Sequence, residues 1–180
     1  MIYRRLIIFI SFFSLLAAGC GYTTRSVIAD RFHTVYVNPV INKIDITDES
    51  YSANRYRTYS AFIETEITQA LIDKFLSDGN LRPTSEDAAD LVLKGELVEF
   101  RKDPLRYDKN DDVIEYRLNL VLNLTLLDRR QSKVLWTENH FTGTTTYFTS
   151  DSAVKTDDQA INEALADLAR RVVERTIEDW

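Results

Sequence analysis

The sequence predicts a two-layer α+β sandwich, in which two helices pack on one face of a four-stranded, mainly antiparallel sheet. The first observation is a long alternation. Every even-numbered residue from Ile114 to Leu126 is apolar or aromatic, as in a strand with one face in a core. The second is that residues 56–77 and 156–177 carry apolar residues at three- and four-residue spacing, as in helices that bury one stripe. Each element needs an apolar partner for that face, and packing the helices on the sheet supplies it.

The first half of the predicted domain contains one strand and one helix. Residues 32–40 predict a strand, with Val35 and Val37 on one face and Pro39 at its end. The polar residues 41–55 predict a loop. The helix over 56–77 then ends before Gly79, since glycine adopts the left-handed capping conformation without steric cost.

The second half predicts three strands and the second helix. The strands cover residues 91–100, 113–127 and 134–148. Gly95 lies in the middle of the first and is a candidate β-bulge. The helix over 156–177 has Thr156 or Asp157 as its N-cap. The resulting order is β-α-β-β-β-α.

The N-terminus has the zones of an export signal. Arg4 and Arg5 precede an uncharged, apolar stretch over residues 6–18, which is too short to span about 30 Å of hydrocarbon. The stretch ends in Leu16-Ala17-Ala18-Gly19-Cys20, the arrangement of a lipobox. Cleavage before Cys20 and attachment of a diacylglycerol and an N-acyl chain there would anchor the protein in a membrane.

Two details refine this prediction. The commonest lipobox has Leu three residues before the cysteine, where this chain has Ala17. The alternative is an ordinary signal peptide cut near Gly19, which would leave Cys20 as a free thiol, since the chain contains one cysteine. Gly21 follows the cysteine instead of Asp, the usual inner-membrane retention residue. The expected location is therefore the periplasmic side of the outer membrane.

The predicted organisation is a signal peptide over residues 1–19, a lipidated tether over 20–31 and a single α+β domain over 32–180. After cleavage, 20 basic and 28 acidic residues remain, a formal net charge of −8. An acidic chain without a basic run argues against nucleic acid as a partner. Any anionic ligand must be held by locally placed cations.

The sequence contains none of the common catalytic or metal-binding motifs, such as HExxH, GxSxG or a phosphate-binding loop. The single cysteine is assigned to lipid, and the two histidines, His33 and His140, lie on separate predicted strands. Asp111 and Asp112 could be imagined as a cation site, but adjacent acids in a polar hairpin are usually solvated turn residues. We therefore expect no enzyme, no metal and no cofactor beyond the covalent lipid.

Taken together, the lipidation site Cys20-Gly21-Tyr22, the β-α-β-β-β-α order and the pair Glu115-Tyr116 opening the long strand resemble the LPS-assembly lipoprotein family, LptE. The resemblance covers nearly all of the mature chain. The supporting pieces are Ala89-Asp90, Leu127-Asp128, Leu135-Trp136 and Gly143 before Tyr147.

This resemblance implies a role without a reaction. Members of the family form a complex with the large outer-membrane β-barrel LptD, plug its lumen, are needed for its assembly, and bind lipopolysaccharide on its way to the cell surface. Basic residues at one end of the sheet are the implied lipopolysaccharide contacts. Lys109, six residues before Glu115, and Lys155, in Lys155-Thr156-Asp157-Asp158-Gln159, match those places.

Alternatives remain open for the site residues and for the function. Lys109 and Lys155 could be solvated loop lysines, with Arg101, Lys102 and Arg106 of the same hairpin as further candidates. Polar residues of the long strand, such as Asn119, could face a barrel lumen or bulk water. The chain could also be another envelope binding module, as an auxiliary component of a lipid transporter or a regulator of cell-wall synthesis. A small hydrolase is the remote third option.

Overall fold

The computed structural model describes residues 31–44, 62–150 and 154–177. Cys20, the signal peptide and the tether up to residue 30 lie outside the described residues, as do residues 45–61. Residues 45–55 of the predicted loop therefore stay a prediction. The first predicted helix, over 56–77, is wrong at Phe62, because this residue is the N-cap of a helix that begins at Ile63: it has a left-handed φ of 68° and is 71% exposed. Residues 56–61 of that prediction lie outside the described residues.

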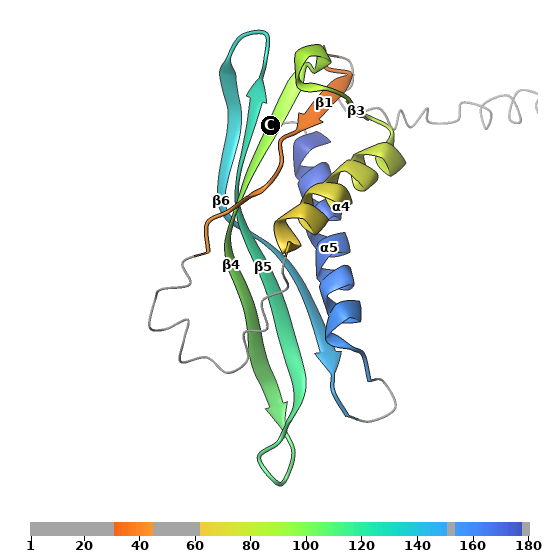
Figure 1. The fold of residues 1–180 in the computed structure, drawn as a ribbon, viewed down its shortest axis with the longest axis vertical. Coiled ribbons are helices and arrows are strands. Elements are labelled where there is room, and N and C mark those ends of the chain that lie inside the picture. Colours follow the sequence, from red (N-terminus) through yellow and green to blue (C-terminus); the bar gives the residue numbers. More distant parts are fainter. Residues whose placement is uncertain (1–30, 45–61, 151–153, 178–180) are drawn as a thin grey trace, which may run out of the picture.

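Two helices pack on one face of a mixed, mainly antiparallel sheet, which confirms the predicted fold class (Figure 1). The strand order is β3-β1-β4-β5-β6, with β2 also pairing with β4. The elements are β1 (Thr34–Val37), β2 (Ile41–Asn42), α4 (Ile63–Asp78), β3 (Arg82–Pro83), a 3₁₀ turn (Glu86–Ala88), β4 (Leu91–Tyr107), β5 (Val113–Asp128), β6 (Lys133–Phe148) and α5 (Asp157–Ile177).

Two short strands were not expected. Strand β2 lies inside the predicted loop over 41–55, and that part of the prediction is wrong because Ile41 and Asn42 pair in parallel with Glu96 and Leu97 of β4. Strand β3 pairs in parallel with β1. Both are only two residues long, too short for a pattern of alternation to develop in the sequence.

The core lies between the helices and the sheet. Helix α4 buries Ile63, Ile67, Leu71 and Phe75, the stripe that the helical spacing predicts. On β1, Val35 and Val37 are buried, and on β5 the even-numbered leucines from Leu118 to Leu126 are buried. The strand faces predicted for β1 and β5 are therefore confirmed.

A β-bulge in β4 moves the core face from odd to even residues. The pairing with β5 shifts between Leu97 and Glu99. Leu97 faces the core before the bulge, and Phe100 is buried after it. The predicted bulge at Gly95 is wrong: this residue pairs regularly with Leu124. It is instead a site of close packing, because a Cβ at Gly95 would lie 3.2 Å from Cγ2 of Val40.

A second bulge, in β6, moves the core face from even to odd residues. Leu122 pairs with Phe141 and Leu124 with Glu138, so β6 contains one extra residue there. His140 adopts a positive φ of 58°, and its backbone N–H donates to Oδ1 of Asn123 at 3.1 Å. The bulge turns the following odd-numbered residues toward α5.

Gly143 is the first small residue that the bulge in β6 directs toward α5. A Cβ at this position would lie 2.4 Å from Cβ of Leu168 and 2.8 Å from the carbonyl oxygen of Ala164, both on α5. The helix therefore rests directly on the backbone of β6. It also seals the edge of that strand, since Asp167 accepts the Thr144 N–H at 3.1 Å and Arg171 donates to the Thr142 carbonyl.

The hairpin of β4 and β5 extends past the start of α5 (Figure 1). Strand β4 continues to Tyr107, beyond its predicted end at residue 100, because its pairing with β5 persists to the contact between Tyr107 and Val113. No helix among the described residues is long and apolar enough to cross a membrane.

Replacing Gly143 by Ala should destabilise the protein. The new methyl group meets helix backbone atoms that cannot move independently, so α5 must shift, at a cost of about 1–3 kcal/mol. Chemical denaturation would measure it. Gly95→Ala is the matched control with a smaller expected loss, because the added methyl group there meets side-chain methyl groups. Equal losses in the two variants would contradict the direct contact of α5 with β6.

Candidate functional site

The candidate site lies where the long hairpin leaves the helix layer and α5 begins. A capping box starts that helix. The N–H of Gln159 donates to Oγ1 of Thr156 at 3.2 Å, and the N–H of Thr156 donates to Oε1 of Gln159 at 3.0 Å. Of the two predicted N-cap residues, Thr156 and Asp157, the structure therefore selects Thr156. The cap holds Asp157 at the first helical position, directly above the sheet.

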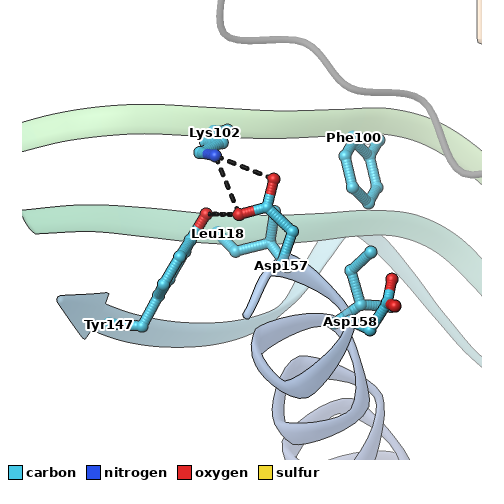
Figure 2. A pocket seen from close by; sticks show the side chains of 7 residues that line it. Phe100, Lys102, Leu118, Tyr147, Asp157 and Asp158 are labelled. Atoms are coloured by element: carbon cyan, nitrogen blue, oxygen red, sulfur yellow. Dashed lines mark hydrogen bonds and ion pairs between the residues drawn. The ribbon is translucent and has the colours of Figure 1, made fainter. Parts of the chain in front are cut away.

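Lys102 and Tyr147 converge on the carboxylate of Asp157 (Figure 2). Nζ of Lys102 lies 3.0 Å from both carboxylate oxygens, and the hydroxyl of Tyr147 donates to Oδ1 at 2.5 Å. The lysine comes from β4, the tyrosine from β6 and the aspartate from α5. The cluster therefore ties the start of the helix to two strands that are not neighbours in the sheet.

Two tyrosine rings lie next to the ammonium group of Lys102. Nζ of Lys102 lies 4.2 Å from the ring centre of Tyr116 and 5.3 Å from that of Tyr147. The two rings stack with their centres 5.9 Å apart. The Lys102 side chain is 13% exposed. Such a cation is stabilised by the ring faces as well as by the carboxylate.

The protonation states follow from these contacts. Burial alone would raise the pKa of Asp157, but hydrogen bonds from Tyr147 and Lys102 and the charge of Lys102 lower it below its ordinary value. Burial, the hydrogen bond to Asp157 and the negative charge of that carboxylate raise the pKa of Tyr147. At neutral pH the aspartate is ionised and the tyrosine keeps the proton that it donates.

A small pocket of about 120 Å³ opens beside the cluster. Apolar side chains line it together with the charged side chains of Lys102, Asp157 and Asp158 (Figure 2). The lining residues are Phe100, Lys102, Leu118, Tyr147, Asp157, Asp158 and Ile161. The volume is well below that of sites enclosing drug-sized ligands, and a lining with one cation and two carboxylates offers no attraction for an anion.

Lys155 lies beside this cluster, just before α5. Its backbone N–H donates to the carbonyl of Phe148 at 3.1 Å, which places it at the end of β6. Its Nζ lies 2.7 and 2.8 Å from the two carboxylate oxygens of Glu163. Thr145 of β6 donates to the same carboxylate at 2.9 Å. The hydrogen bonds from Lys155 and Thr145 lower the pKa of Glu163.

Lys109 lies in the turn between β4 and β5. The turn is organised by Asp108, whose Oδ1 accepts the N–H groups of Asn110 at 2.8 Å and Asp112 at 2.9 Å. Among the described residues Lys109 has no ion-pair partner, and it is exposed. The register brings this turn and Lys155 to one end of the sheet, since Glu115 pairs with Phe148. The lysines' role as lipopolysaccharide contacts stays a prediction.

The three further candidate cations of the hairpin lie in different surroundings. Lys102 belongs to the cluster, whereas Arg101 pairs with Glu99 at 3.0 Å and Asp103 at 2.7 Å on the opposite face. Arg106 lies 3.4 Å from Glu115. Sequence reasoning missed the roles of Tyr147 and Asp157 because the two bulges decide which face they share with Lys102. The Thr156-x-x-Gln159 pattern was the available signal, since it places Asp157 at the start of a helix.

The open face of the sheet carries a polar network. Asn119 is 5% exposed and donates to Oδ2 of Asp103 at 3.0 Å, the same oxygen that accepts from Arg101. The polar face of β5 is therefore structured by cross-strand hydrogen bonds. In the part of the chain that the structure describes, no three His, Cys, Asp or Glu side chains form a group suited to a metal.

Comparison with known proteins yields a family. The sequence model of the family described as LptE, lipopolysaccharide-assembly, matches residues 32–176. No curated protein sequence matches the chain.

Two solved structures show the same fold at low identity, and a third is more weakly similar. A protein from Xanthomonas campestris has a TM-score of 0.54 at 14% identity, with 81% of this chain and 84% of that chain covered. A hypothetical protein from Chlamydia trachomatis has a TM-score of 0.51 at 13% identity, with 81% and 95% covered. The rare lipoprotein B from Shewanella oneidensis has a TM-score of 0.43 at 12% identity, with 78% and 92% covered.

Asp157→Asn tests the cluster through the pH dependence of stability. A carboxylate with a lowered pKa stabilises the fold above its unfolded pKa and loses that effect as the pH falls through its folded pKa. The variant should lose about 1 kcal/mol at neutral pH, a small value because solvent screens a partly exposed pair. Urea denaturation should show this loss shrinking as the pH falls below the ordinary aspartate pKa and through the lowered pKa of the folded state. Asp158→Asn is the control, and a pH-independent loss in Asp157→Asn would contradict the assignment.

Proposed function

This chain belongs to the LptE lipopolysaccharide-assembly family, and from that premise we propose that it plugs and helps to assemble an LptD-like outer-membrane β-barrel. We propose further that it binds lipopolysaccharide and assists its transport to the cell surface. Family membership makes it a non-catalytic assembly lipoprotein of the cell envelope. The match over residues 32–176 is the observation that carries the proposal, since it spans both helices and all the long strands.

The proposed address is the periplasmic face of the outer membrane. Residues 1–19 act as the signal peptide, Cys20 carries the lipid, and residues 20–31 form the tether to the domain over 32–180. Two or three acyl chains hold a protein stably where one would not. The anchor keeps the domain close to the membrane and so raises its effective concentration near a membrane-embedded partner.

The shape of the sheet supports insertion into a barrel. The hairpin of the long strands β4 and β5 forms a narrow end that extends past the helix layer (Figure 1). Its open face carries the network of Arg101, Asp103 and Asn119. The lumen of a large outer-membrane barrel is polar, so a polar surface suits it better than an apolar one.

Local cations support lipopolysaccharide binding at this end. Lipopolysaccharide carries phosphates, and a lysine ammonium is a point-charge partner for phosphate. Lys109 and Lys155 lie at the hairpin end of a chain whose overall charge is negative. Recognition of the glycolipid would then depend on these positions and not on general attraction to anions.

Capture of the partner tests the first part of the proposal. The tagged lipoprotein, purified from detergent-solubilised outer membrane, should carry an LptD-like β-barrel with it, identified by mass spectrometry. Cys20→Ala should reduce the recovered barrel, because the protein loses its membrane anchor. Co-purification of an inner-membrane complex or a soluble periplasmic enzyme in place of a barrel would contradict the proposal.

Charge reversal tests the second part. Lys109→Glu and Lys155→Glu should each weaken binding of purified lipopolysaccharide roughly tenfold, which corresponds to about 1.4 kcal/mol. Lys133→Glu, an exposed lysine at the other end of β6, is the matched control and should leave the affinity unchanged. Calorimetry with lipopolysaccharide in detergent micelles measures the effect. Unchanged affinity in both test variants would remove these lysines from the site.

A further inference from the structure

The carboxylate of Glu163 occupies a cradle formed by two donors from other segments. Lys155 contacts both of its oxygens, at 2.7 and 2.8 Å. The hydroxyl of Thr145 donates to one of them at 2.9 Å. An ammonium and a hydroxyl that converge on one two-oxygen anion form a small anion site, here filled by a side chain of the protein itself.

A phosphate group suits the same donors. Like a carboxylate, a phosphate group presents at least two oxygens that can accept hydrogen bonds, and it carries at least as much negative charge. We propose that Lys155 and Thr145 form a phosphate site, that Glu163 fills it in the free protein, and that a phosphate of lipopolysaccharide binds by displacing Glu163. This inference rests on the proposed function and adds Thr145 as a ligand and Glu163 as an internal competitor.

The geometry allows the exchange. The side chains of Lys155 and Glu163 are 38% and 45% exposed, and ion pairs at such exposure are weak. Glu163 lies on the surface of α5 and can rotate into water without disturbing the core. Thr145 is held in place because its strand pairs with β5 at Leu118. The donors therefore stay in position while their acceptor changes.

The neighbouring carboxylate does not take over the vacated place. Asp157 already accepts from Lys102 and Tyr147, so its negative charge is matched. Glu163 is ionised at neutral pH, as an ordinary glutamate is, and the hydrogen bonds from Lys155 and Thr145 lower its pKa further. A phosphate must therefore displace a charged group.

Removal of the competitor is the direct test, on the full lipidated protein in detergent. Glu163→Gln should bind lipopolysaccharide about two- to fivefold more tightly than wild type, as expected for the loss of one exposed ion pair. Glu174→Gln is the matched control, since Glu174 lies on the same helix, is 48% exposed and pairs with Arg170. Thr145→Val should weaken binding, and dephosphorylated lipopolysaccharide should show no gain with Glu163→Gln.

The double variant Lys155→Met with Glu163→Gln decides whether the gain acts through the cradle. A gain that persists without Lys155, or that Glu174→Gln matches, overturns the inference. Wild-type protein that fails to bind lipopolysaccharide defeats the proposed function instead. In that case, the affinity of wild type and of Glu163→Gln for inorganic pyrophosphate is measured. Tighter binding by Glu163→Gln supports a site for free phosphates, and equal affinity overturns the inferred phosphate site.

Discussion

The direct contact of α5 with the backbone of β6 at Gly143 is the constraint on which the rest of the structure depends. With no side chain between them, the helix lies within van der Waals reach of the strand, and its position along the strand is set at Leu168 and Ala164. Every contact of its N-terminal half follows from that position. Asp167 reaches the strand edge, Glu163 reaches Thr145, and Asp157 reaches Tyr147. A larger residue at Gly143 would disturb all of them together.

The two β-bulges decide which side chains meet the helix. A regular strand keeps one parity on the core side along its whole length. The extra residue in β4 before Glu99 and the extra residue in β6 near His140 reverse that parity half-way. Lys102 and Tyr147 lie after the reversals, and both face Asp157. Bulges of this kind commonly re-aim side chains, and here they bring a cation and a phenol from separate strands onto one carboxylate.

Internal ion pairs organise the charges of the hairpin end. Four cations there each contact an acid of the same chain: Arg101 with Asp103, Lys102 with Asp157, Arg106 with Glu115 and Lys155 with Glu163. Burial differs among them. Lys102 is covered by tyrosine rings and its pair ties the helix to the sheet, whereas Lys155 is more exposed to water; the two acids are similarly exposed. The covered pair therefore serves the architecture, and the exposed pair is the one that an external anion can exchange.

The sequence by itself determined the class of fold and the core faces of β1 and β5, and it limited the cap of the last helix to Thr156 or Asp157. Each of these depends on local periodicity or on residues within one turn, as with the even-numbered leucines of β5 or Thr156 and Gln159. Only the tertiary structure decided which side chains form the site. A single-residue bulge leaves no reliable trace in composition, yet it exchanges the two faces of a strand. The sequence therefore identified Lys155 as a cation near the last helix, but the fold supplied Thr145 and Glu163 as its neighbours.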